Sequence, residues 1–303
     1  MSFNLTILGC SSATPTSQRH PTSHYLSIHD RHFLIDCGEG TQMQLRKFKL
    51  KFARINRIFI SHLHGDHYLG LIGFLSSLHL LNCTHEVHVY CPEPLKEIID
   101  IQFKHSDVKL RYPLIFHFLN HKKAELIFED DKVSVESIVL NHRIPCCGFV
   151  FREKPPLLSI RKDKMDYYKI LPQDILKIKK GADYKTTDGK LIKNETLTYP
   201  PAKLRSYAFC SDTCYDESLL PHIKNVSLLY HEATFMKALK TRAKETYHST
   251  TIDAATIAKK AKVEKLIIGH FSARYKDLEP LLEESKEVFE NTVLAEEGIK
   301  YEV

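Results

Sequence analysis

The sequence predicts an α/β protein, an αββα sandwich in which two mixed β-sheets pack face to face and helices cover their outer sides. Strand and helix patterns alternate over the first hundred residues, and consecutive strand patterns follow from residue 115 to residue 152. This succession is typical of two sheets enclosed by helices. The 303 residues are enough for one large domain, and we expect a single domain over residues 1–303 that carries one insertion.

Short apolar runs bounded by turn residues define the expected strands. Before the insertion they fall at 3–8, 25–28, 33–35, 58–60, 87–90, 115–118, 124–128, 132–140 and 148–152. Apolar residues at helical spacing, or a leading proline, predict helices at 41–48, 70–82 and 94–103.

Order returns at residue 206, after the expected insertion. Further strands are expected at 206–210, 228–230 and 266–268, and further helices at 250–261 and 277–289. Thr250 is the expected N-cap of the first of these helices, because Asp253 stands three residues later as in a capping box.

Composition indicates an ordinary globular protein. Hydrophobic residues make up 43% and charged residues 26% of the chain, and the formal net charge is +6, which permits a nucleic-acid partner without requiring one. No apolar run approaches the roughly 20 residues of a membrane helix. No secretory pattern opens the chain, so we expect eight reduced cysteines, a cytoplasmic location and no membrane association. The 18 histidines favour a metal site.

Four metal-capable side chains follow the strand expected at residues 58–60. They are His62, His64, Asp66 and His67. His62 and His64 are two residues apart and would share one side of extended chain, whereas Asp66 and His67 would diverge toward a second centre after a tight turn at Gly65. Imidazoles with carboxylates that leave one position open to water are typical of catalytic zinc. The alternative, a polar loop whose histidines bond to the backbone, requires four such residues to coincide by chance.

Other expected strands also end on a metal-capable residue. His142, Asp212 and His270 follow the strands at 132–140, 206–210 and 266–268. Strand ends that converge at one edge of a sheet are where such folds build their sites. A lone histidine at position 142 or 270 would more often be structural. A second alternative is a thiolate ligand beside Asp212, from Cys210 or Cys214.

Residues 152–205 differ from the rest of the chain. They contain two Pro-Pro pairs and many lysines, and little of the segment has a core periodicity. We interpret the segment as an insertion that projects from the body, and a solvated, loop-rich flank is the alternative.

The chain resembles the metallo-β-lactamase superfamily and, within it, the ribonuclease Z family. The resembling stretches cover nearly the whole chain in order: Leu8–Pro15, Asp36–Gln42, His62–His67, Ser211–Thr213, His231–Thr234, His248–Thr250 and Gly269–Ser272. The first histidine motif marks only the superfamily, whereas the stretches beginning at Asp36, His231 and His248 are much more specific.

The resemblance implies a two-zinc centre. His62, His64 and His142 would hold one zinc, Asp66, His67 and His270 would hold the second, and Asp212 would bridge both. Two such ions roughly 3.5–4 Å apart bind a bridging hydroxide and clamp a phosphate. Asp66 matches the family's proton acceptor, and His248 would stabilise the transition state or protonate the leaving 3′ oxygen.

Two further residues have expected supporting roles. Glu232 would orient a neighbouring histidine, and Asp36 would shape the loop under the site without binding metal. The alternative for His248 is a histidine at a helix start that bonds only to the backbone.

The implied function is a zinc-dependent endoribonuclease that removes the 3′ trailer from precursor tRNA and leaves a 3′ hydroxyl. The implied assembly is a homodimer in which the arm of one subunit grips the tRNA elbow for its partner. The family's arm often carries a Gly-Pro stretch, whereas the nearest match here, Gly181-Ala182-Asp183-Tyr184, lacks the proline.

Two other function classes share these features. A small-molecule hydrolase of the same superfamily, such as a phosphodiesterase or an arylsulfatase-like enzyme, would use the same ligands without needing a basic insertion. A non-catalytic tRNA-binding protein would not need His248 beside intact ligands.

Overall fold

The computed structural model describes residues 2–303, which form two compact units. The larger unit consists of residues 2–129, 134–152 and 205–303. The smaller consists of residues 130–133 and 153–204. The larger unit contains every residue assigned above to the metal centre.

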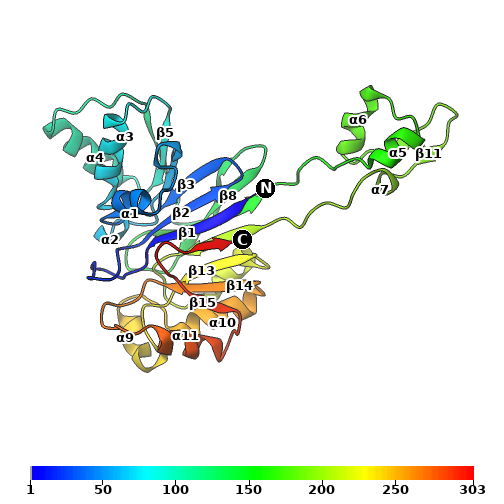
Figure 1. Cartoon of the computed structure of the whole chain (residues 1–303). Coiled ribbons are helices and arrows are strands. Elements are labelled where there is room, and N and C mark those ends of the chain that lie inside the picture. Colours follow the sequence, from blue (N-terminus) through cyan, green and yellow to red (C-terminus); the bar gives the residue numbers. More distant parts are fainter. Residues whose placement is uncertain (1) are drawn as a thin grey trace. The chain divides into compact units, whose positions relative to one another are not determined.

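Two seven-stranded sheets form the centre of the larger unit (Figure 1). The first has the order β16-β1-β2-β3-β4-β5-β6. Its strands are β1 (Phe3–Gly9), β2 (Ser23–Ile28), β3 (Arg31–Ile35), β4 (Arg57–Phe59), β5 (Val87–Cys91), β6 (Leu114–Phe118) and β16 (Lys300–Glu302). The second sheet has the order β15-β14-β13-β12-β9-β8-β7. Its strands are β7 (Glu125–Glu129), β8 (Val133–Leu140), β9 (Cys146–Glu153), β12 (Ser206–Cys210), β13 (Leu228–Glu232), β14 (Lys265–Gly269) and β15 (Thr292–Leu294).

Helices lie beside both sheets in Figure 1, with α1 to α4 next to the first and α9 to α11 next to the second. The α-helices of this unit are α1 (Thr41–Lys47), α2 (Gly65–Tyr68), α3 (Leu71–Leu80), α4 (Pro94–His105), α8 (Leu220–Ile223), α9 (Lys240–Glu245), α10 (Thr251–Ala261) and α11 (Glu279–Lys286). Thr250 caps α10 in a complete capping box with Asp253, as predicted. The two mixed sheets with outer helices are the predicted fold class.

Aromatic rings fill the space between the sheets. Phe59 of the first sheet stacks on Tyr90 and meets Phe149 and Phe151 of the second sheet at centroid distances of 5.3 Å. These side chains are fully or almost fully buried. The contacts hold the two sheets at one spacing, so residues that leave different strands can meet at a defined distance.

Strand direction decides where the site forms. In the first sheet β3, β4, β5 and β6 run parallel, and in the second β12, β13, β14 and β15 run parallel. The carboxyl ends of parallel strands lie at one edge of a sheet. The loops that follow β4, β12 and β14 carry the expected ligands away from such edges.

The structure corrects the prediction for Gly65. This residue begins the one-turn helix α2, so the chain continues there as a turn of helix and not as a separate tight turn. His64 is extended, with φ −73° and ψ 143°, and Asp66 lies in the first turn of the helix. The helical turn thus separates His64 from His67. The short strands β15 and β16 were not predicted, because three residues are too few to establish a period of two.

The smaller unit has a core of its own. Its elements are α5 (Lys162–Tyr167), α6 (Pro172–Lys179), β10 (Tyr184–Lys185), β11 (Leu191–Ile192) and α7 (Asn194–Leu197). Its buried apolar residues are Ile170, Ile178, Tyr184, Ile192 and Leu197. Buried Asn194 donates side-chain hydrogen bonds to the carbonyls of Ile178 and Ala182, which joins two of these segments. The segment is therefore a small folded unit, although elements this short gave no periodicity in the sequence.

Two further observations concern membrane-spanning helices and cysteines in residues 2–303. No helix among them is long and apolar enough to cross a membrane. The eight cysteines lie in this range and are all free thiols.

Candidate active site

A pocket of about 380 Å³ opens at the converging strand ends of the larger unit. His64, Asp66, His142, Asp212, His248 and His270 all line it. They come from the segments after β4, β8, β12 and β14 and from the turn before α10. The structure therefore brings together residues that are more than two hundred positions apart in the chain.

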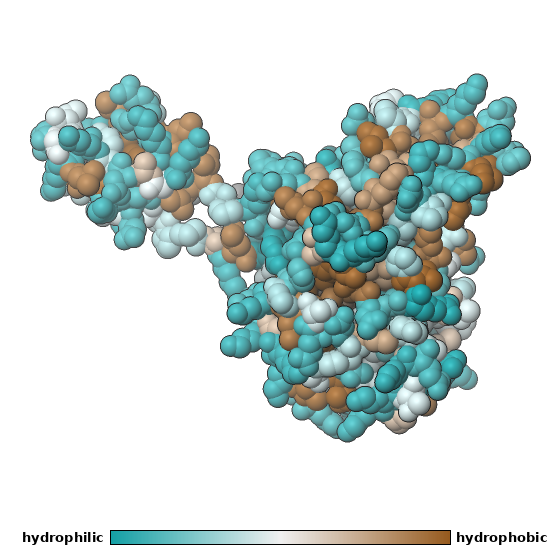
Figure 2. All heavy atoms as spheres, turned by 180° about the vertical axis from the view of Figure 1, so that it is seen from behind, coloured by the Kyte–Doolittle hydropathy of each residue, from teal (hydrophilic) through white to brown (hydrophobic). Residues whose placement is uncertain are grey.

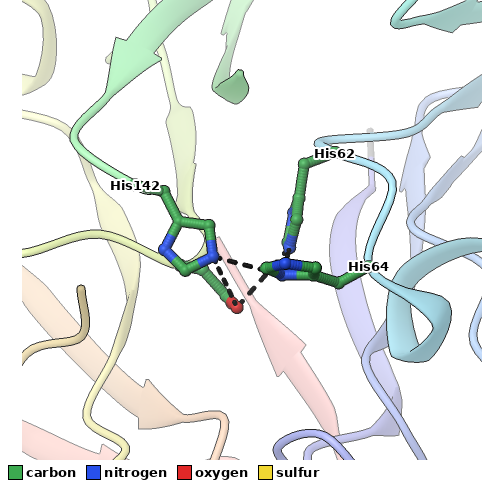
Figure 3. A group of neighbouring side chains, drawn as sticks. His62, His64 and His142 are labelled. Atoms are coloured by element: carbon green, nitrogen blue, oxygen red, sulfur yellow. Dashed lines mark hydrogen bonds and ion pairs between the residues drawn. The ribbon is translucent and has the colours of Figure 1, made fainter. Parts of the chain in front are cut away.

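The first cluster contains His62, His64, His142 and Asp212. Nδ1 of His64 lies 2.9 Å from Nε2 of His62 and 3.2 Å from Nε2 of His142 (Figure 3). Oδ2 of Asp212 lies 3.6 Å from Nε2 of His62 and 3.8 Å from Nε2 of His142. Four ligand atoms around one ion with metal–nitrogen bonds of about 2 Å would be about 3.3 Å apart, so this spacing fits a tetrahedral metal.

The second cluster contains Asp66, His67 and His270. Oδ2 of Asp66 lies 3.4 Å from Nε2 of His67 and 3.4 Å from Nε2 of His270. The other oxygen of Asp212, Oδ1, is 3.4 Å from His67 and 3.2 Å from His270. Asp212 therefore presents one carboxylate oxygen to each cluster.

Burial keeps the first cluster's imidazoles neutral. Burial lowers the pKa of His62 well below its usual value and that of His64 to about 4, and it also lowers the pKa of His142. Neutral imidazole is the form that binds metals. These three side chains can therefore act as ligands at neutral pH.

The site holds more negative charge than the protein itself balances. Asp36, Asp212 and Glu232 are buried, and the side chain of Asp66 is 8% exposed. Within residues 2–303, none of the four forms an ion pair with a lysine or arginine. Buried carboxylates need compensating cations, so divalent metal ions fit this donor set.

His67 lies where the surrounding carboxylates most strongly favour a positive charge. Burial lowers its pKa, but the carboxylates of Asp66, Asp212 and Asp36 outweigh burial and raise the pKa well above its usual value. Its Nε2 is buried and makes no hydrogen bond among the described residues. An unsatisfied ring nitrogen between two carboxylates is what a metal ligand presents.

Most ligand rings are fixed through the nitrogen that points away from the cluster. Nδ1 of His142 donates to the backbone carbonyl of Tyr247 at 2.9 Å, and Nδ1 of His270 lies 2.9 Å from the Thr234 hydroxyl. Nδ1 of His62 lies 2.9 Å from the Ser61 hydroxyl. An acceptor at the outer nitrogen leaves the inner nitrogen free for a metal.

Asp36 supports both clusters from below. Its carboxylate accepts hydrogen bonds from the Ser61 backbone amide at 2.7 Å and the Ser61 hydroxyl at 2.9 Å, and it lies 2.7 Å from Nδ1 of His67. Ser61 in turn contacts His62. The structure thus places Asp36 under the site, outside both clusters, where it orients one histidine of each.

His248 and Glu232 form a buried pair at the edge of the pocket. Nδ1 of His248 lies 2.8 Å from Oε1 of Glu232, which also accepts from the backbone amide of Thr213. Burial lowers the pKa of His248, but the Glu232 charge and hydrogen bond raise it to about 9. The Glu232 contact thus favours the doubly protonated ring of His248, and this side chain does more than bond to the backbone. It also lies within reach of Asp212 and His270, so its ring is metal-capable as well.

The two cysteines near Asp212 do not join either cluster. Cys210 is buried, and burial raises its pKa to about 12, which keeps it a thiol. Cys214 is also absent from the metal-capable groups found among residues 2–303.

Pocket residues missed at the sequence level include Arg143, Glu39, Leu69 and Thr246. Leu69, Arg143 and Thr246 stand outside the quoted motifs, whereas Glu39 lies in the Asp36–Gln42 stretch but was not assigned to the pocket. Adjacency to the ligand His142 was the only signal that could have pointed to Arg143.

Sequence comparison with known proteins shows which family this chain belongs to. A ribonuclease Z of Phocaeicola vulgatus is 46% identical over 301 residues, which cover 99% of this chain and 97% of that protein. The chain belongs to the ribonuclease Z family. This membership confirms the predicted activity class, a metal-dependent endoribonuclease of tRNA 3′ processing, and does not favour the small-molecule alternative.

Solved structures agree with this assignment. The crystal structure of human tRNase Z, short form, matches with a TM-score of 0.72 and 26% identity and covers 98% of each chain. The metallo-β-lactamase fold protein YhfI of Bacillus subtilis matches with a TM-score of 0.70 at 17% identity over all of both chains, which shows the fold. A family model described as anti-Pycsar protein Apyc1 matches residues 3–103. The predicted metallo-β-lactamase fold is thereby confirmed.

We predict that Asp36→Asn weakens metal binding about 10- to 100-fold, because the amide disturbs the orientation of His67 and Ser61. Metal affinity is to be measured by competition with a chromophoric chelator, with circular dichroism to verify the fold. Asp100→Asn, on the exposed face of α4, is the control and should bind metal like the unaltered protein. Unchanged affinity in Asp36→Asn would show that Asp36 does not orient the ligands.

Proposed function

We propose that this ribonuclease Z family member is a zinc-dependent endoribonuclease that cuts the 3′ trailer from precursor tRNA and leaves a 3′ hydroxyl. The observation that carries the proposal is the pair of histidine–aspartate clusters that share Asp212 inside a pocket also lined by His248. A phosphodiester in this pocket would contact both clusters and a proton donor together.

We assign two Zn²⁺ per subunit. His62, His64 and His142 would hold one ion, Asp66, His67 and His270 would hold the other, and Asp212 would serve both. Imidazole and carboxylate donors with tetrahedral spacing favour zinc. When bound, the two ions activate a water for in-line attack and neutralise charge on the phosphate.

The protein's own groups handle the protons. Burial raises the pKa of Asp66, but His67 and His270 outweigh burial and lower the pKa below its usual value, so Asp66 is ionised and can accept the proton of the attacking water. His248 is held by Glu232 and protonated at neutral pH, so it can donate a proton to the departing 3′ oxygen. We therefore assign Asp66 and His248 the catalytic roles.

Residues 153–204 of the smaller unit supply the positive charge that a long polyanion requires. Residues 153–204 contain twelve Lys or Arg and seven Asp or Glu, which gives +5 of the chain's +6. Within residues 2–303, Lys162, Lys169, Lys179, Lys180, Lys185 and Lys190 form no ion pair. Hydrophilic residues cover much of the face seen in Figure 2. We propose that residues 152–205 are the arm that binds precursor tRNA through its phosphates.

The assembly and location follow from the same proposal. The arm of one subunit would serve the site of its partner in a homodimer, as the family resemblance implies. The protein would act in the cytoplasm, where its eight free thiols remain reduced.

A cleavage assay tests the proposal directly. The zinc-loaded protein should cut a precursor tRNA with a 3′ trailer once, at or just beyond the discriminator base, and a chelator should abolish the cut. End mapping identifies the position and the 3′ hydroxyl. If the precursor remains uncut while a small phosphodiester is hydrolysed, the function belongs to the small-molecule branch of the superfamily.

Replacing His248 should impair chemistry and spare binding. We expect His248→Ala to lower kcat for precursor cleavage about 10²- to 10⁴-fold, because the variant has no proton donor at this position. Single-turnover rates, precursor affinity and metal content are to be measured together. A normal rate at full metal content would contradict the assigned role. His105→Ala, at the end of α4, is the control.

Removing the arm should affect activity on precursor tRNA and on a small phosphodiester differently. Arg152 of β9 pairs with Ser206 of β12, so the segment leaves and re-enters the sheet at neighbouring positions. Replacing residues 155–200 by a short Gly-Ser linker should therefore spare hydrolysis of a small chromogenic phosphodiester and greatly weaken precursor cleavage. Equal loss on both substrates would mean that the segment belongs to the core.

A lysine variant refines the deletion. Alanine at Lys179, Lys180 and Lys185 should raise KM for the precursor. The slope of the logarithm of the binding constant against the logarithm of the salt concentration should become less steep, by roughly 0.7–0.9 for each phosphate that the variant no longer neutralises. Alanine at Lys177 and Lys193, which pair with Asp174 and Asp183, is the matched control and should have a smaller effect.

A further inference from the structure

Arg143 is the one lysine or arginine that lines the active-site pocket in the part of the chain that the structure describes. It follows His142 in the loop between β8 and β9, and its side chain is exposed. Its Nε lies 3.1 Å from Nε2 of His64. No carboxylate among residues 2–303 forms an ion pair with it.

The partner of Arg143 is unusual for a ligand histidine. The outer nitrogens of His62, His142 and His270 face a hydroxyl or a carbonyl, which can accept a hydrogen bond. The outer nitrogen of His64 faces the N–H of a guanidinium, which can only donate.

The hydrogen bond from Arg143 to His64 cannot persist if His64 acts as a metal ligand, because of where the ring then carries its proton. Nδ1 of His64 is the nitrogen that faces His62 and His142, so it is the ligand atom. A neutral imidazole has one N–H, and a ring that uses Nδ1 as a ligand carries its proton on Nε2. In the structure Nε–H of Arg143 donates to Nε2 of His64, and this hydrogen bond would be lost once Nε2 carries the ring proton.

The guanidinium is then available to an acceptor that enters the pocket. Its planar fork of N–H donors matches the oxygens of a phosphate. His248 and Thr246 line the same pocket, so Arg143 and the assigned proton donor face one cavity.

We propose that Arg143 binds a phosphate oxygen of the RNA strand in the active site and positions the phosphodiester for cleavage. This inference rests on the proposed function and adds a substrate-binding residue to it. Arg143 would contribute through contact with substrate and would leave metal binding to the histidines and aspartates.

The experiment compares Arg143→Ala and Arg143→Lys with Arg111→Ala, an exposed arginine outside the pocket. Four quantities are measured on the zinc-loaded proteins: kcat and KM for precursor tRNA, the same constants for a small chromogenic phosphodiester, the inhibition constant of inorganic phosphate, and bound zinc. We expect Arg143→Ala to lower kcat/KM about 10- to 100-fold on both substrates and to weaken phosphate inhibition about 10-fold or more, at unchanged zinc content.

Lysine should restore only part of the activity, because it keeps the charge without the fork. Unchanged kcat/KM and phosphate inhibition in Arg143→Ala would overturn the proposal, and so would a decrease explained by reduced zinc content. The small phosphodiester and phosphate report on Arg143 even where the precursor is not cut, so failure of this inference is distinguishable from failure of the proposed tRNA substrate.

Discussion

The burial of carboxylates that no lysine or arginine balances is the constraint on which the rest of the structure depends. Asp212 is almost completely buried, and its two oxygens face two separate groups of histidines. Asp36, Asp66 and Glu232 lie close by, and no lysine or arginine of residues 2–303 pairs with any of them. Such a cluster is stable only with cations in place or with protons shared among its imidazoles, so metal binding and the integrity of the site are linked.

Two packed sheets make this concentration of charge possible. The aromatic layer around Phe59 fixes the distance between the sheets, and the parallel strands bring their carboxyl ends to one edge. Hydrogen bonds from the outer ring nitrogens then orient the histidines against rigid acceptors. Asp36 connects the clusters through Ser61 and His67. A change in a supporting residue such as Asp36 or Ser61 would therefore shift a ligand histidine without replacing it.

Charge is divided between the two units in a way that suits a long anionic substrate. Nearly all of the net positive charge lies in residues 153–204, which have their own small core, whereas the larger unit holds the buried carboxylates. In the proposed function, the first would attract the phosphates of the precursor and the second would cut one phosphodiester. Arg143 and His248 place positive charge beside the clusters, where a phosphodiester would otherwise meet mainly carboxylates.

The sequence by itself determined the fold class and most elements, because strand periods are local signals. It pointed to the seven residues of the two clusters through the spacing from His62 to His67 and through the ends of three further strands. It could not reveal that Gly65 begins a helix, that residues 153–204 fold around Ile178 and Leu197, or that strands β15 and β16 complete the sheets. Those features depend on contacts between distant segments. Only the tertiary structure decided that Glu232 holds His248, that Asp36 supports His67, and that Arg143 faces His64, because hydrogen-bond partners far apart in the chain leave no periodic trace in it.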